Sequence, residues 1–246
     1  MMEKEYRFYS EFHRKEDTIL EFAKNLNNAF YDFSRYDQRF GLLEAHLPEG
    51  NKIVKLVEDG ISVLELAEAI LEYNKKDIRK FDKLAEPNIY YKRPFGFSFG
   101  FNFRDCKGQN IFSLRLKYGG VEATFKYQMN ETPIKQVEPF NMKWYKEFFL
   151  SITSNLPIKY AVVRPRDSDY LQKVVTKYKY PLGLLTYFSD EVINFDLLKN
   201  DIFTKEITER GLLYCTNNEV FVEEQTLEEL YSLMNKISES DKNYLV

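Results

Sequence analysis

Cysteine and histidine are scarce in this sequence, which holds two of each in 246 residues. Cys106 and Cys215 lie far apart and show no spacing typical of a metal site, so we expect two reduced thiols. His13 and His46 each stand without the further ligands that a zinc ion needs. The sequence therefore predicts that the chain holds no metal and no cofactor.

Several catalytic motifs are also missing. The sequence contains no phosphate-binding P-loop, no H-E-x-x-H and no C-x-x-C. Gly96 and Gly100 fall inside a predicted strand, so they do not form a phosphate cradle. We therefore expect that the chain is not an enzyme. An enzyme with a site assembled from scattered carboxylates and tyrosines stays open as an alternative.

Long apolar runs and concentrated basic runs are absent too. No stretch approaches the ~18 apolar residues of a membrane-spanning helix. The opening residues, MMEKEYRFYSEF, lack the apolar region of a signal peptide. The net charge is −3, which does not favour binding to nucleic acid. We expect a cytoplasmic protein that contacts neither membrane nor nucleic acid.

Aromatic residues are what the sequence has in excess: 21 Phe and 18 Tyr bring the aromatic share to 16%. One interpretation is a large aromatic core. The other is a contact surface rich in tyrosine, a residue type enriched where proteins meet. Both interpretations stay open at this stage.

The segment PFGFSFGFNF, residues 94–103, carries phenylalanine at every second position and predicts a strand with one apolar face. Two more strands follow, at 111–118 and 121–129. Gly119-Gly120 suits a two-residue hairpin turn that pairs Tyr118 with Val121. We expect one buried face under helices, formed by Phe97, Phe99, Phe101, Leu114, Leu116 and Phe125. A hydrophobic ligand groove on this face is the alternative.

Capping boxes mark three expected helix starts: Thr18 with Glu21, Ser62 with Glu65, and Thr226 with Glu229. Apolar residues recur at helical spacing after each of them. Helical patterns also cover 141–156 and 167–178. Residues 41–61 are expected to form a loop, with a short helix near 52–59.

Further strands are expected at 5–13, 158–165, 183–189, 211–216 and 219–224. Asn217-Asn218 suits a tight turn that pairs Cys215 with Val220. The predicted fold is α+β: a largely antiparallel sheet, made of the aromatic-faced meander and the C-terminal strands, with helices packed on its apolar face. We expect a single domain, 1–246, with 1–132 and 133–246 as possible halves.

Acidic residues gather near the end of the chain, and tyrosines occur in two polar loops. The acidic residues fit either a solvated face that opens a helix or a surface that steers a basic partner. If a partner binds, the expected contact residues are Tyr90, Tyr91, Tyr180, Glu219, Glu223 and Glu224.

The order of segments resembles the immunity protein 52 family of bacterial toxin systems. The likeness rests on the opening strand and helix that end in YDQRFGLL, on the PFGFSFGFNF strand with its meander, on PLGLLTYFSDE, and on GLLYCTNNEVFV before a terminal helix. It extends over nearly the whole chain. The family has no catalytic residues to carry over.

The resemblance implies a non-enzymatic protein that binds and neutralises a cognate toxin in the cytoplasm, by blocking its active site or substrate access. Its partner would be that toxin. A small-ligand-binding or regulatory module with an aromatic pocket is the alternative. A cavity behind the phenylalanine strand would favour the ligand module, and carboxylates converging in a cleft would favour an enzyme.

Overall fold

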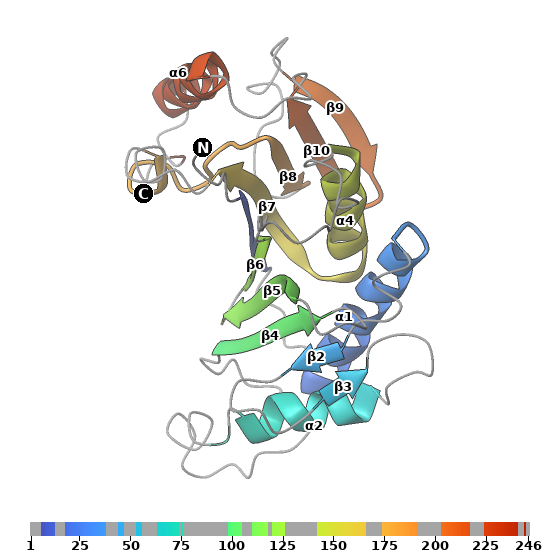
Figure 1. The fold of residues 1–246 in the computed structure, drawn as a ribbon. Coiled ribbons are helices and arrows are strands. Elements are labelled where there is room, and N and C mark those ends of the chain that lie inside the picture. Colours follow the sequence, from blue (N-terminus) through green and yellow to red (C-terminus); the bar gives the residue numbers. More distant parts are fainter. Residues whose placement is uncertain are drawn as a thin grey trace, which may run out of the picture.

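The computed structural model describes residues 6–12, 18–37, 44–46, 53–55, 63–73, 75, 98–104, 110–117, 120–125, 142–165, 174–190, 203–216, 224–240 and 244. Within these residues the chain forms ten strands and four helices (Figure 1). The expected α+β fold, with helices against a largely antiparallel sheet, is confirmed.

The ten described strands form one sheet. They are β1 Tyr6–Phe12, β2 Glu44–His46, β3 Ile53–Lys55, β4 Ser98–Arg104, β5 Asn110–Lys117, β6 Gly120–Phe125, β7 Ile158–Pro165, β8 Leu185–Ser189, β9 Phe203–Thr208 and β10 Gly211–Thr216. Their order is β3-β2-β4-β5-β6-β1-β7-β8-β10-β9, and neighbouring strands are antiparallel. The described helices are α1 Ile19–Ser34, α2 Val63–Tyr73, α4 Met142–Asn155 and α6 Glu224–Ser240.

Strand β1 joins the two predicted halves of the chain. It pairs with β6 of the meander on one side and with β7 on the other, so that Phe8 has Ala123 and Val163 as its register partners. One hydrogen-bonded sheet therefore contains strands from both 1–132 and 133–246.

The meander has the expected strands but a different register at its second turn. Leu116 pairs with Val121 and Lys117 with Gly120, so the predicted pair of Tyr118 and Val121 is wrong by two residues. Alternation repeats every two residues, and a slip of two leaves the same residues on the same face. The pattern therefore could not distinguish the two registers.

The register still brings the predicted apolar rows together. Phe99 pairs with Leu116 and Phe101 with Leu114. Leu114 pairs in turn with Ala123, the register partner of Phe8. The side chains of β2 to β6, and Phe97 as a whole, lie outside the described residues, so the burial of this face stays a prediction.

Two short strands replace the loop and helix expected between residues 41 and 61. Strand β2 pairs with both β3 and β4, which places His46 opposite Ile53 and Asn102. The predicted helix near 52–59 is wrong at Ile53–Lys55, which is extended. Three-residue strands carry almost no periodic signal, and they form only because a neighbouring strand offers its edge.

Helix α1 begins as its sequence predicts. The hydroxyl of Thr18 accepts a hydrogen bond from the backbone N–H of Glu21, and the Glu21 carboxylate accepts one from the Thr18 backbone. This reciprocal capping box satisfies two N–H groups that a helix start leaves without partners. The apolar stripe beyond it is buried, from Ile19 to Phe33.

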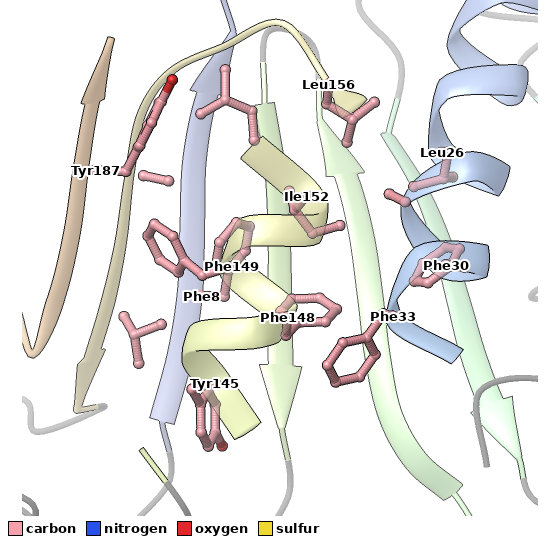
Figure 2. Packing of buried hydrophobic residues seen from close by; sticks show 14 of the residues in the cluster. Phe8, Leu26, Phe30, Phe33, Tyr145, Phe148, Phe149, Ile152, Leu156 and Tyr187 are labelled. Atoms are coloured by element: carbon pink, nitrogen blue, oxygen red, sulfur yellow. The ribbon is translucent and has the colours of Figure 1, made fainter. Parts of the chain in front are cut away.

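Helices α1, α2 and α4 cover the face of the sheet that carries Phe8. Their apolar stripes form the first core cluster with β1, β7, β8 and β10. In Figure 2, Phe148, Phe149 and Ile152 of α4 point from the helix toward the strands, beside Phe33 of α1. The ring centroids of Phe8 and Phe149 are 5.2 Å apart, in an edge-on arrangement that aromatic pairs favour.

The opposite face of the C-terminal strands is apolar as well, and α6 packs on it (Figure 1). Leu230, Leu233, Met234 and Ile237 are buried there, as the helical spacing predicts. This second core cluster gives β7, β8 and β10 two covered faces. The helix begins at Glu224, so the expectation that Thr226 caps it is wrong.

The predicted hairpin between 211–216 and 219–224 is also wrong. Strand β10 already has β8 on one side and β9 on the other: Cys215 pairs with Leu185 and Thr204, which leaves no edge for Val220. A Cβ at Gly211 would lie 2.1 Å from the carbonyl oxygen of Phe188, so only glycine fits where β10 begins. Strand β9 was not predicted, because its polar residues resemble a loop.

Candidate partner-binding surface

The residues expected to contact a partner fall largely outside the described residues. Those outside are Tyr90, Tyr91, Glu219 and Glu223. Glu224 is the first residue of α6, and its side chain is not among the described ones. Tyr180 is the one expected contact residue whose side chain is described.

Tyr180 is a core residue. Its side chain is only 6% exposed and belongs to the second core cluster, against Tyr160 and Phe188. The Nζ atoms of Lys159 and Lys179 lie 5.2 Å and 5.5 Å from its ring centroid. The expectation that Tyr180 is an exposed anchor is therefore wrong: its ring is buried, and the two lysines lie beside it in space.

The exposed aromatic residues of the described chain lie elsewhere, at the end of α1. Tyr31 is 47% exposed and Tyr36 is 39% exposed, and no other aromatic residue with a described side chain is so open to solvent. Together with Arg35 and with Lys143 of α4 they form what we call the α1 tyrosine surface.

Arg35 holds one side of this surface in place. Its guanidinium carbon lies 4.8 Å from the ring centroid of Tyr31, within cation–π distance. A side-chain hydrogen bond with Tyr31 is the main reason that the pKa of Arg35 is raised above its usual value. The ring and the cation therefore restrict each other before any partner arrives.

Tyr36 is supported from below by the core. Its ring stacks on the buried ring of Phe33 at 6.0 Å, and Phe33 in turn meets the edge of Trp144 at 5.0 Å. The indole Nε1 of Trp144 donates a hydrogen bond of 2.8 Å to Asp37. This contact ties the end of α1 to the start of α4 and fixes the base of the surface.

Acidic groups beside the surface are already hydrogen-bonded within the protein. Asp37 accepts from Trp144, and Asp32 accepts a bond of 2.9 Å from the Nδ2 of Asn155. The Nζ of Lys143 lies 6.0 Å from the ring centroid of Tyr36. The surface thus combines exposed aromatic rings with cations that lie over them, while its carboxylates have partners in the protein.

The sequence analysis did not predict this surface, although the helical spacing of α1 indicates part of it. The helical spacing that turns Phe30 and Phe33 inward leaves Tyr31 and Arg35 on the outer side of α1. Nothing in the sequence places Lys143 beside Tyr36, because that proximity arises from the packing of α4 against α1.

Sequence reasoning also overlooked one motif. Residues 96–100, GFSFG, match G-x-S-x-G, a pattern that presents a nucleophilic serine where a strand turns into a helix. Here Ser98 is the first residue of β4 and pairs with Lys117, and the chain continues as a strand to Arg104. A serine in this extended ladder does not have the geometry of a nucleophile elbow.

One cluster of ionisable groups lies between α4 and the sheet. The Nζ of Lys146 forms an ion pair with Glu206 of β9, close to Cys215 of β10. Burial raises the pKa of the Cys215 thiol to about 11, although Lys146 opposes this shift. An activated cysteine needs a lowered pKa, so Cys215 lacks the character of a nucleophile.

We expect Cys215 to react slowly with a thiol reagent at pH 8. A pKa raised from 9.0 to about 11 lowers the thiolate fraction about 100-fold. The measurement is the labelling rate in a Cys106→Ser background, with the unfolded chain as the control. A folded rate within about threefold of the unfolded rate would show that the thiol is neither buried nor shifted.

Two features are absent from the described residues. They contain no group of three or more His, Cys, Asp and Glu side chains that could hold a metal ion. None of their helices has both the length and the apolar character needed to cross a membrane.

Comparison with known proteins gives a similarity of fold. No family model matches the sequence, and no curated protein matches it. Among solved structures, a Pseudomonas aeruginosa T6SS protein, PA0821, is similar with a TM-score of 0.51 at 11% identity. The match covers 94% of this chain and 74% of that chain. At this identity it shows a shared fold, and membership of the immunity protein 52 family stays a prediction.

Proposed function

We propose that this chain is a non-enzymatic immunity protein that binds and neutralises a cognate bacterial toxin. The observation that carries the proposal is the α1 tyrosine surface. Tyrosine and arginine are the residue types that supply much of the energy of protein interfaces. Here Tyr31, Arg35 and Tyr36 are exposed; Tyr31 and Arg35 contact each other, and Tyr36 stacks on the buried ring of Phe33.

Restraint matters because binding costs conformational entropy. A mobile tyrosine loses freedom when a partner fixes it, whereas Tyr36 is already stacked on Phe33 and Tyr31 already lies under Arg35. Such a preorganised surface suits specific and tight binding. Arg35 and Lys143 would attract acidic groups of a partner, with Asp32 and Asp37 as the nearby carboxylates of the protein itself.

Two independent likenesses support the class of partner. The order of segments in the sequence resembles that of the immunity protein 52 family, although no family model matches the sequence. The fold is similar to that of a T6SS protein, and type VI secretion is a setting that fits a toxin system. In this proposal the chain acts in the cytoplasm, where it covers the toxin's active site or the access of its substrate.

The proposal is tested by mixing the purified chain with the product of the adjacent reading frame. We expect a stable complex on size exclusion, with an association rate that falls as salt is added. A matched variant, Leu64→Ala, changes a side chain of similar exposure on α2 and should leave the complex intact. Failure to form a complex at micromolar concentration would contradict the proposal.

A further inference from the structure

Four cations lie along the rim of the second core cluster, each over a tyrosine ring. We call them the cationic rim: Lys159, Arg164, Lys177 and Lys179. Lys159 and Lys179 share one ring, because the Nζ atoms of both lie within cation–π distance of Tyr180. Tyr180 is buried, so its ring supports the two ammonium groups from the core side.

The other two cations lie over rings that belong to this cluster or pack against it. The guanidinium carbon of Arg164 is 5.4 Å from the ring centroid of Tyr9. The Nζ of Lys177 is 5.1 Å from the ring centroid of Tyr178 and 5.4 Å from that of Tyr231. Each cation therefore has a ring that restricts its position.

These rings form one connected set. The ring centroids of Tyr9 and Tyr160 are 6.5 Å apart, and those of Tyr160 and Tyr180 are 5.2 Å apart. Tyr244 connects the remaining part: its hydroxyl donates a hydrogen bond to the carbonyl oxygen of Tyr180, and its ring centroid is 5.6 Å from that of Tyr178. The packing of the core therefore fixes the four cations relative to one another.

No carboxylate within the described part of the chain forms an ion pair with the cationic rim. Lys177 donates a hydrogen bond of 2.8 Å to the neutral side chain of Asn235, and the buried Nε of Arg164 has no acceptor among the described residues. Glu11 accepts a hydrogen bond from the hydroxyl of Tyr9, on its own strand. The rim is thus a local excess of positive charge in a chain whose net charge is −3.

We propose that the cationic rim binds an acidic segment of a partner protein. Lysine and arginine form charge-assisted hydrogen bonds with carboxylates, and unpaired cations attract such groups from a distance. Because the rings already restrict these cations, binding costs them little further conformational entropy. The inference goes beyond the proposed function, since the cationic rim and the α1 tyrosine surface share no residue.

Nucleic acid is the other polyanion that a cationic surface could take, and the structure favours it less. Proteins that bind single strands present open aromatic faces on which bases stack. Here Tyr178 and Tyr180 are buried, and lysines lie over their rings. The net charge of −3 also disfavours a long phosphate backbone. The observations therefore favour carboxylates as the groups that bind.

The test is fluorescence anisotropy of a labelled polyglutamate peptide at low salt. We expect saturable binding that weakens as salt is added. Lys159→Gln/Lys179→Gln should weaken binding at least about tenfold, because it removes both ammonium groups over Tyr180. The matched control, Lys24→Gln/Lys205→Gln, removes the same charge from exposed lysines elsewhere and should change the affinity less than about twofold.

A further variant separates this site from the α1 tyrosine surface. Arg35→Gln/Lys143→Gln removes the cations of that surface and should bind the peptide as the wild type does. Equal losses in this variant and in Lys159→Gln/Lys179→Gln would overturn the proposal. So would a wild type without saturable binding, or one that binds an oligothymidylate of equal charge more tightly. Lys179 is exposed, so Lys179→Gln alone should weaken binding about threefold with the fold unchanged.

Discussion

Replacing Phe148 with alanine is expected to lower the free energy of unfolding by about 3–5 kcal/mol. Phe148 is fully buried between α4 and the sheet. Its ring meets Phe8 at 5.6 Å and Phe33 at 5.3 Å, both edge-on, and stacks on Trp144 at 5.9 Å. Its loss removes contacts to β1, to α1 and within α4 at once, and the close-packed surroundings cannot collapse into the space.

Denaturant unfolding measures this change, with Val175→Ala as a control at a position that is 39% exposed. The control should change stability by less than about 0.5 kcal/mol. A loss below about 1 kcal/mol for Phe148→Ala would mean that α4 does not pack on β1 as the structure has it.

Replacing Tyr31 and Tyr36 together with alanine is expected to weaken the toxin complex at least about 30-fold, as removal of central interface anchors does. Neither side chain belongs to the buried core, so the fold should survive the substitution, although Tyr36 loses its stacking on Phe33. Arg35→Ala should weaken binding further through the loss of both its charge and its support of Tyr31. Calorimetric titration with the toxin measures these affinities.

The matched control for this surface is Leu64→Ala, which removes an apolar side chain of similar exposure from α2. Equal affinities for the wild type, the control and the double tyrosine variant would place the binding surface elsewhere on the chain. A loss of affinity accompanied by a lowered unfolding midpoint would be a stability effect, so thermal unfolding of each variant belongs to the same experiment.

Local sequence signals predicted the start of α1 and the buried face of α6, but they were wrong on a helix at Ile53–Lys55 and on a cap at Thr226. The capping box at Thr18 and the stripe from Leu230 to Ile237 depend on neighbours within one turn, and the structure has both. The strand signals predicted the positions of β1, β4 to β8 and β10, but they missed β2, β3 and β9 and the register of the second meander turn. The Tyr118–Val121 pairing failed because a period of two cannot detect a shift of two.

What the sequence could not supply was long-range pairing. Strand β9 lies at the edge of the sheet and holds threonine, lysine and glutamate, so its pattern resembles a loop until β10 is placed beside it. The same limit applies to the candidate site. Tyr180 was expected outside because it lies in the polar segment KYKYP, 177–181, yet its ring is buried in the second core cluster with residues of α6. Tyr36 becomes a fixed anchor only through Phe33 and Trp144.

The central claim, neutralisation of a toxin, is tested most directly by survival. The adjacent reading frame is expressed in a sensitive host with the wild-type chain, with the Tyr31→Ala/Tyr36→Ala variant, or with Leu64→Ala, at matched protein levels. We expect the wild type and Leu64→Ala to restore growth and the double tyrosine variant to protect poorly. Cells that die equally with and without the wild-type chain would contradict the proposed function.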